Sequence, residues 1–143
     1  MNTLLLDAAL GTQLAVNGEE VPDWKKSIWS AYSLINNPDA ILKIHIDNIE
    51  AGADVITTSN YYATPIILAK DSDKHDYKEL VKRALDLAQE AIHVSGKKCL
   101  IAGSFPPINV SFRPDLTGTK AELENFYRNF CLLYTSPSPR DVP

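Results

Sequence analysis

Polar and small side chains follow three short, apolar segments of this 143-residue chain, at positions where a ligand could bind. Asp7 follows the apolar run Leu4–Leu6, residues 57–60 (TTSN) end the segment DVITTSN, and Gly103–Ser104 follow CLIA. Such segments are typical of a parallel sheet covered by helices, and these sheets bind ligands beyond the carboxyl ends of their strands. Taken alone, Asp7 is equally compatible with ligand binding and with a structural role as a cap or loop hydrogen-bond acceptor.

For the other side chains that could take part in chemistry, the sequence favours a structural role over a catalytic or binding role. His45 falls inside an apolar helical pattern, where a packed or half-exposed imidazole is commoner than a ligand, and no histidine has metal-ligand spacing. Cys99 begins a predicted buried strand, which indicates an inert core thiol. Tyr61 and Tyr62 are expected to pack over the sheet, although a pocket wall also suits them.

Three strands and three helices must position these residues. The β-rich runs cover residues 3–7, 54–58 and 99–103. Helical patterns follow each of them, so the order is strand, helix, strand, helix, strand, helix. This alternation predicts an α/β fold with a parallel sheet and right-handed crossovers. The strand ends should therefore meet at one rim, which is where we expect ligand chemistry.

The predicted helices have recognisable ends. The first covers about residues 38–51, with Asn37 as its cap and a proline at its first position. The second runs from the cap Asp76 to a glycine stop at Gly96. Thr119 with Glu122 resembles the capping box that opens a third. Between these elements, the connections 8–37 and 104–118 are longer than a β/α unit needs, and their aromatic residues favour ordered, site-forming loops.

Charge and composition exclude several classes of protein. The 14 Lys and Arg residues are outnumbered by 18 Asp and Glu, and no basic stripe suits a nucleic acid. No run approaches the roughly 20 apolar residues that span a bilayer. The first residues carry no basic segment typical of a secretory signal, and two cysteines do not suggest a disulfide framework. We therefore expect a cytoplasmic protein whose partners are small molecules rather than nucleic acid or membrane.

In combination, three ordered blocks resemble the homocysteine S-methyltransferase family over about residues 3–130. The blocks are LLLDAALGTQL, IWSAYSLINNPDAILKIHIDNIEAGADVITTSNYYATP and IAGSFPPINVSFRPDL. The order of all three is far more specific than any one of them. Two departures from the common pattern are Ala8–Ala9, where glycine is frequent, and Gly103–Pro107, which replaces a glycine-containing turn.

The resemblance implies a (β/α)₈ TIM barrel that transfers a methyl group from a sulfonium donor, S-methylmethionine or S-adenosylmethionine, to homocysteine, giving methionine. A barrel of this kind needs about 250 residues, so this chain would hold its first three β/α units. Asp7 would contact the amino group of homocysteine. The resemblance also places further residues at the substrate mouth: Thr58, Asn60, Tyr62 and Ser104.

The family activates the homocysteine thiol with zinc held by three cysteines from late barrel strands. A zinc-bound thiol is deprotonated, so the resemblance implies zinc in the full-length parent. None of those cysteines is among the residues of this chain, and we expect no metal ligand here.

The last residues, CLLYTSPSPRD at 131–141, resemble one reading frame of a sequencing-library adapter. We therefore expect a partial barrel domain over residues 1–130, a non-native tail over 131–143, and a fragment that is inactive alone. A natural Ser/Pro-rich tail is the alternative. Two other functions stay open: a small non-catalytic α/β domain that binds a ligand or partner, and another barrel enzyme that uses Asp7 as a base.

Overall fold

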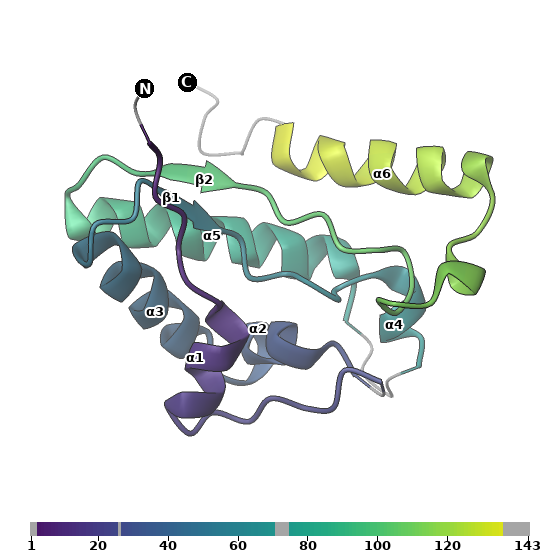
Figure 1. The fold of residues 1–143 in the computed structure, drawn as a ribbon, viewed down its shortest axis with the longest axis horizontal. Coiled ribbons are helices and arrows are strands. Elements are labelled where there is room, and N and C mark those ends of the chain that lie inside the picture. The colour runs from purple at the N-terminus through teal and green to yellow at the C-terminus, as the bar shows by residue number, and fades with distance from the viewer. Residues whose placement is uncertain (1–2, 26, 71–74, 136–143) are drawn as a thin grey trace.

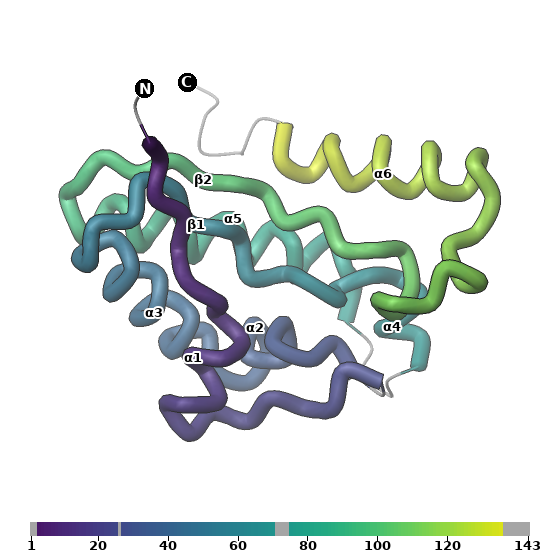
Figure 2. The backbone as a smooth tube through the Cα atoms, in the orientation of Figure 1, coloured from purple at the N-terminus to yellow at the C-terminus, as the bar shows by residue number. Residues whose placement is uncertain are grey.

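Two short parallel strands and the segment that precedes α1 form the centre of the fold. The computed structural model of the chain describes residues 3–25, 27–70 and 75–135. Strand β1 (Val55–Thr57) pairs in parallel with β2 (Leu100–Ala102), and Leu6 forms a parallel bridge to Val55 on the opposite side of β1. Figure 2 shows the three segments side by side. The predicted parallel α/β arrangement is therefore confirmed.

Helices cover one side of these strands and continue around the ends (Figure 1). The helices are α1 (Leu10–Val16), α2 (Ser33–Asn36), α3 (Pro38–Glu50), α4 (Pro65–Leu68), α5 (Tyr77–Ser95) and α6 (Lys120–Thr135), with 3-10 turns at Trp29–Tyr32 and Pro114–Leu116. Helices α3 and α5 pack together behind the strands, and α6 packs on α5. Among the described residues, no helix combines the length and apolar character of a membrane span.

Small residues of α5 allow this close packing. Ala88 and Ala91 are fully buried, and they contact a cluster that contains Ile49 of α3 and Ile56 of β1. Because alanine side chains are short, the helix can approach both the strand and α3 at close-packed density. The same helix buries Val81 on another face, against the aromatic rings of α6. Helix α5 is therefore the common support of the strands and α6.

The predicted helix ends are largely confirmed. Asp76 caps the start of α5, and its side chain accepts a hydrogen bond from the Lys78 amide at 3.1 Å. The box at α6 is reciprocal, since Glu122 accepts from the Thr119 amide at 2.7 Å while the Thr119 hydroxyl accepts from the Glu122 amide. These bonds satisfy amides that have no partner within their helices.

Asn37 occupies the N-cap position of α3 as expected, but the capping hydrogen bond is missing. Instead, the side-chain Nδ2 of Asn37 donates to both carboxylate oxygens of Glu19 at 3.0 Å, which ties the start of α3 to the connection after α1. A long-range partner has replaced the local capping bond of the Asn37 side chain, and Pro38 occupies the first position of the helix as predicted.

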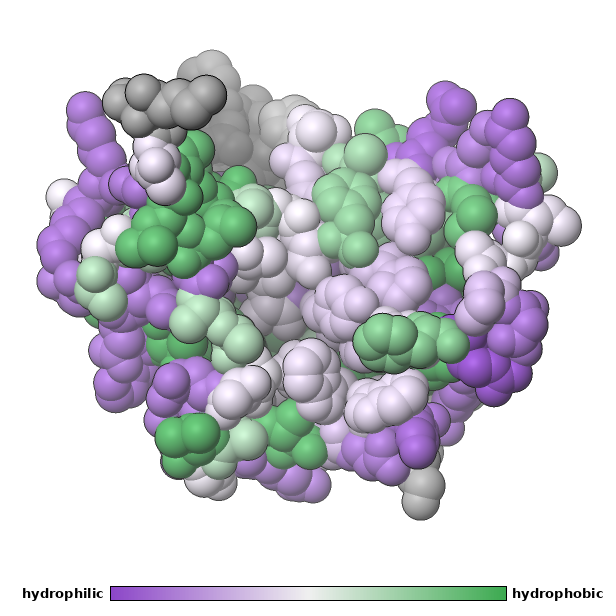
Figure 3. Space-filling model, viewed as in Figure 1, coloured by the Kyte–Doolittle hydropathy of each residue, from purple (hydrophilic) through white to green (hydrophobic). Residues whose placement is uncertain are grey.

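The expected burial of the first and third strands is also wrong. Leu4, Leu5 and Leu6 are 61%, 56% and 62% exposed, and Figure 3 shows a hydrophobic patch over this segment, below the N-terminus. Leu100 of β2 is exposed as well, and Cys99 beside it is only half-buried. The helices cover one face of the strands, and within the described residues no element covers the outer side of Leu4–Leu6.

The end of α5 depends on Gly96, which has a φ of 65° in the left-handed region. A Cβ added there would meet no atom within 4 Å, so the Gly96→Ala substitution tests the backbone conformation alone. We expect it to lower the free energy of unfolding by about 1 kcal/mol, measured by urea denaturation. Gly96→Asn is the matched control and should lose less, because asparagine tolerates this conformation. Equal losses would contradict the explanation.

Candidate functional site

A hollow of about 400 Å³ lies at the carboxyl ends of the strands. Three of the residues singled out from the sequence line it, namely Asp7, Thr58 and Ser104, and each follows a different parallel segment. The prediction that the strand ends meet at one rim is therefore confirmed. The remaining wall comes from residues 8–11, Trp29–Ser30, Thr57, Ser59 and Tyr61.

Asp7 joins the first segment to β1 through both of its carboxylate oxygens. Oδ2 accepts the Thr57 backbone N–H at 2.8 Å, and Oδ1 accepts the Thr57 hydroxyl at 2.9 Å. The Asp7 amide donates to the Val55 carbonyl at 2.9 Å, which continues the parallel pairing. The carboxylate is half-buried and lines the hollow, so it has a structural role and remains accessible to a ligand.

Thr58 and Asn60 join β1 to the chain after β2. The Thr58 hydroxyl oxygen accepts the Ser104 amide at 2.8 Å, and the Asn60 side-chain amide donates to the Ser104 carbonyl at 3.1 Å. All three residues are buried. Thr58 and Ser104 line the hollow directly, whereas Asn60 lies behind them and fixes the position of the Ser104 backbone.

The hydroxyl of Tyr134, from the last turn of α6, contacts all three of these residues. It lies 3.1 Å from the Thr58 hydroxyl, 2.9 Å from Asn60 Oδ1 and 3.0 Å from the Ser104 carbonyl. Since the Thr58 oxygen already accepts a bond, its own hydrogen can be donated to Tyr134, whose hydrogen goes to Asn60 or Ser104. Burial raises the pKa of this phenol. No local pattern in the sequence pointed to Tyr134.

Tyr62 lies in an aromatic cluster beside the main hollow rather than in its wall. Its ring stacks on Trp24 at 6.4 Å and meets Trp29 and Tyr61 edge to face, at 6.3 and 5.0 Å between centroids. Its hydroxyl accepts the Ser111 amide at 3.1 Å. Both interpretations left open for Tyr61 and Tyr62 therefore apply, because the buried Tyr62 packs while Tyr61 also lines the hollow.

Trp29 lies in the connection 8–37, which was predicted to form part of a site, but its own role was not singled out from the sequence. Its ring rests on Gly11, where an added Cβ would lie 2.9 Å from two ring atoms, so only glycine leaves room for this contact. Trp29 lines both the main hollow and the smaller aromatic hollow next to it. The sequence signal that could have found this contact is Gly11 itself, because a glycine outside any nucleotide-binding pattern can mark a close approach of another group.

His45 is buried on α3, as the apolar pattern predicted, but its environment is unusual. The side chain is 0% exposed, and neither ring nitrogen has a hydrogen-bond partner among the described residues. Burial lowers the pKa of His45 to about 4, and the negative charge of Asp7 acts in the opposite direction. The imidazole is therefore neutral at pH 7, within electrostatic reach of the site carboxylate.

The described residues do not form a metal site. No group of three or more His, Cys, Asp or Glu side chains in the described ranges could hold a metal ion. Cys99 and Cys131 are both free thiols, one half-buried beside β2 and the other exposed on α6. The residues present therefore do not fit the zinc centre that the resemblance implied.

Comparisons with known proteins agree with this geometry. The family model described as homocysteine S-methyltransferase matches residues 4–136. The chain belongs to the homocysteine S-methyltransferase family. It is 38% identical over 88 residues to homocysteine S-methyltransferase 1 of Arabidopsis thaliana, and 35% identical over 111 residues to homocysteine S-methyltransferase of Escherichia coli, which cover 61% and 73% of this chain.

A solved structure supports the same assignment. The metallated form of the homocysteine methyltransferase MmuM from Escherichia coli superposes with a TM-score of 0.76 at 29% identity, over 95% of this chain. That match covers 51% of the solved chain, and the two sequence matches cover 26% and 35% of the curated relatives. This member of the family therefore spans about half or less of the proteins that it matches.

The buried His45 predicts a pH dependence of stability. The folded pKa of about 4 lies below the ordinary value of 6.5, so below pH 6.5 the unfolded chain binds the proton more readily. Stability should therefore be full above pH 6.5 and fall as the pH approaches 4, by at most about 3 kcal/mol. Urea denaturation at a series of pH values measures this change.

Two variants isolate the contribution of His45. His45→Leu should remove most of the pH dependence between 6.5 and 4. His93→Leu, at an exposed position on α5, is the matched control and should leave it unchanged. If His45→Leu kept the slope of the unmodified chain, another group would be responsible.

Proposed function

We propose that residues 1–130 are the first three β/α units of a (β/α)₈ TIM barrel, and that this barrel is a homocysteine S-methyltransferase. The observation that carries the proposal is that Asp7, Thr58 and Ser104 line one hollow in a chain that the family matches over residues 4–136. The exposed leucines of the first segment support the barrel, because a closed barrel covers the side chains of each strand with its interior packing and its outer helices.

In this proposal Asp7 binds the amino group of homocysteine. Thr57 occupies two of the roughly four lone-pair positions of the carboxylate, so an ammonium group can still be accepted. Thr58, Asn60 and Ser104 provide the polar mouth of the same hollow. If residues 131–143 are a non-native tail, the Tyr134 hydroxyl occupies polar positions that the intact protein leaves to substrate or to other barrel residues.

The sulfonium donor, S-methylmethionine or S-adenosylmethionine, belongs in the neighbouring aromatic hollow. Its walls include Trp24, Trp29, Tyr61 and Tyr62, and aromatic faces attract a cation that has lost part of its water. Trp29 and Tyr61 line both hollows, so donor and acceptor would meet across these two rings. Tyr62 therefore contributes to the donor side of the substrate mouth.

The reaction is a direct methyl transfer. The homocysteine thiol releases its proton to water, and its sulfur then attacks the methyl carbon of the sulfonium. The new S–CH₃ bond forms as the old one breaks, and the electron pair of the broken bond stays on the donor sulfur. The products are methionine and a neutral thioether. Holding both partners in adjacent hollows makes the step effectively unimolecular.

Zinc belongs to this proposal only as a property of the whole protein. A solved relative is described as metallated, but the residues described in this chain do not fit a metal centre, and no step is assigned to one here. The proposed partners are small molecules. The two free thiols suit the reducing conditions of the cytoplasm, which is the proposed compartment.

The test uses a fusion of residues 1–130 to the remaining barrel of the Escherichia coli relative. The fusion should form methionine from homocysteine and S-methylmethionine. Asp7→Asn should raise the KM for homocysteine roughly 10- to 100-fold, with a smaller effect on the donor, because one charge-assisted hydrogen bond to the acceptor is lost. Asp39→Asn, in the exposed first turn of α3, is the matched control.

An equal rise in KM for both substrates would show that Asp7 only holds Thr57 in place. A folded fusion that forms no methionine would contradict the proposed function itself.

A further inference from the structure

The last turn of α6 places the Tyr134 ring against the chain that follows β2. An added Cβ at Gly103 would lie 3.0 Å from the ring, so the ring rests directly on the glycine backbone. The ring centroid also lies 5.5 Å from that of Phe105 and 6.0 Å from that of Phe130. Packing on these three residues holds the ring beside the strand ends, where its hydroxyl reaches Thr58, as described above.

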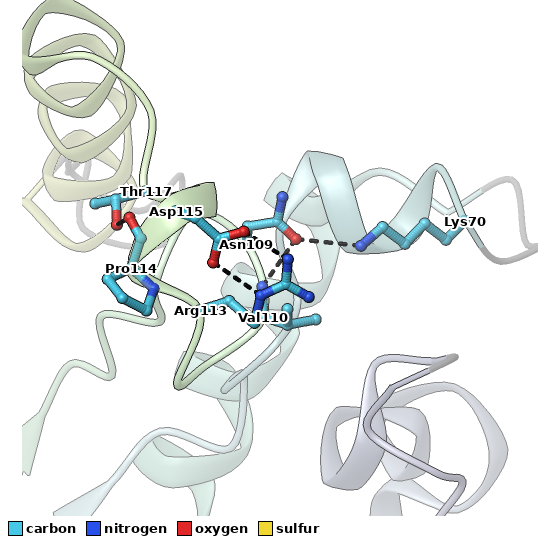
Figure 4. Close-up of polar contacts among 7 residues, drawn as sticks. All are labelled: Lys70, Asn109, Val110, Arg113, Pro114, Asp115 and Thr117. Atoms are coloured by element: carbon cyan, nitrogen blue, oxygen red, sulfur yellow. Dashed lines mark hydrogen bonds and ion pairs between the residues drawn. The ribbon is translucent and has the colours of Figure 1, made fainter.

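The connection that carries α6 is braced before the helix begins (Figure 4). Asn109 Oδ1 accepts Lys70 Nζ at 3.1 Å and the Val110 amide at 2.8 Å. Farther along the connection, Arg113 turns back on Asp115, with Nε donating to Oδ1 at 2.8 Å. The chain that leads to α6 is therefore tied to the segment after α4 and is also held by its own side chains.

The body of α6 is fixed on α5. Phe126 and Phe130 are buried and form a cluster with Val81 of α5, and the Phe130 ring stacks on that of Tyr77 at 6.1 Å between centroids. Tyr134 follows Phe130 by one helical turn, so the two residues share a face of the helix. A fixed helix therefore delivers the Tyr134 hydroxyl to the strand ends.

This hydroxyl uses the only hydrogen that Thr58 can donate. A threonine hydroxyl has one hydrogen and two lone pairs, and one lone pair already accepts the Ser104 amide at 2.8 Å. The Tyr134 hydrogen goes to Asn60 Oδ1 or to the Ser104 carbonyl, so the Thr58 hydrogen goes to Tyr134. Thr58 therefore has no hydrogen left for a ligand in the main hollow, which it lines.

We propose that the last turn of α6 is an autoinhibitory element, in which Tyr134 acts as an internal ligand of Thr58, Asn60 and Ser104. The inference rests on the proposed function, which assigns these three residues to the substrate mouth. It concerns the 143-residue chain, whatever the origin of residues 131–143. Asp7 takes no part in the contact, so a ligand amino group can still bind there, and release of Tyr134 adds Thr58 as a second partner.

The test is calorimetric titration of the 143-residue chain with homocysteine under reducing conditions. Tyr134→Phe keeps the ring and removes only the hydroxyl, so it should tighten binding roughly 3- to 10-fold through the hydrogen released at Thr58. Tyr127→Phe is the matched control on the same helix. Its hydroxyl donates to the Pro106 carbonyl at 3.2 Å, outside the lining of the main hollow, and its loss should leave the affinity unchanged.

A second measurement follows the contact without a ligand. Burial raises the pKa of Tyr134 above its ordinary value of 10.0. In an alkaline titration followed by phenolate absorbance, one tyrosine should therefore ionise late, and this step should be absent from Tyr134→Phe and present in Tyr127→Phe. Loss of the late step from neither variant would contradict the contact itself.

Unchanged or weaker homocysteine binding by Tyr134→Phe would overturn the inference. Equal gains in both variants would also overturn it, because a looser α6 rather than the Thr58 hydrogen would then be the cause. No binding by the unmodified chain or by Tyr134→Phe would count against it as well. The barrel fusion takes only residues 1–130 from this chain and lacks Tyr134, so its methionine formation decides the proposed function independently.

Discussion

The carboxyl ends of three parallel chain segments are held at one level by side-chain hydrogen bonds, and the site depends on this constraint. Asp7 binds both the backbone and the hydroxyl of Thr57, and the Thr58 hydroxyl accepts the Ser104 amide. Strands as short as β1 and β2 have few backbone bonds with which to fix their register. The polar residues of the rim therefore both align the strands and form the binding surface.

A second constraint comes from the aromatic residues that close the rim on one side. Trp29 can approach the first segment only because Gly11 has no side chain, and Tyr62 contacts Trp29, Trp24 and Tyr61 around it. The strained backbones in this cluster are held by packing and by the hydroxyl contacts to Ser111. Rigid aromatic walls next to a polar rim suit a reaction that joins a cationic donor to a polar acceptor.

The helices were predictable because their signals are local. Helix α3 keeps the predicted proline start, and α5 keeps its Asp76 cap and Gly96 stop within one residue of the prediction. The exposure of Leu4–Leu6 was not predictable, because an apolar run indicates a strand but not whether another element covers that strand. Contacts between distant parts of the chain were equally hidden. Tyr134 reaches Asn60 across 74 residues, and no spacing rule reports such a pair.

The central claim is that the rim at Asp7 receives the amino group of homocysteine. A crystal structure of the barrel fusion with homocysteine bound tests this most directly. The account predicts the amino nitrogen within about 3 Å of an Asp7 carboxylate oxygen, with the Asp7–Thr57 bonds intact and the thiol directed toward Trp29 and Tyr61. Homocysteine bound in another part of the barrel, with Asp7 contacting only Thr57, would contradict it.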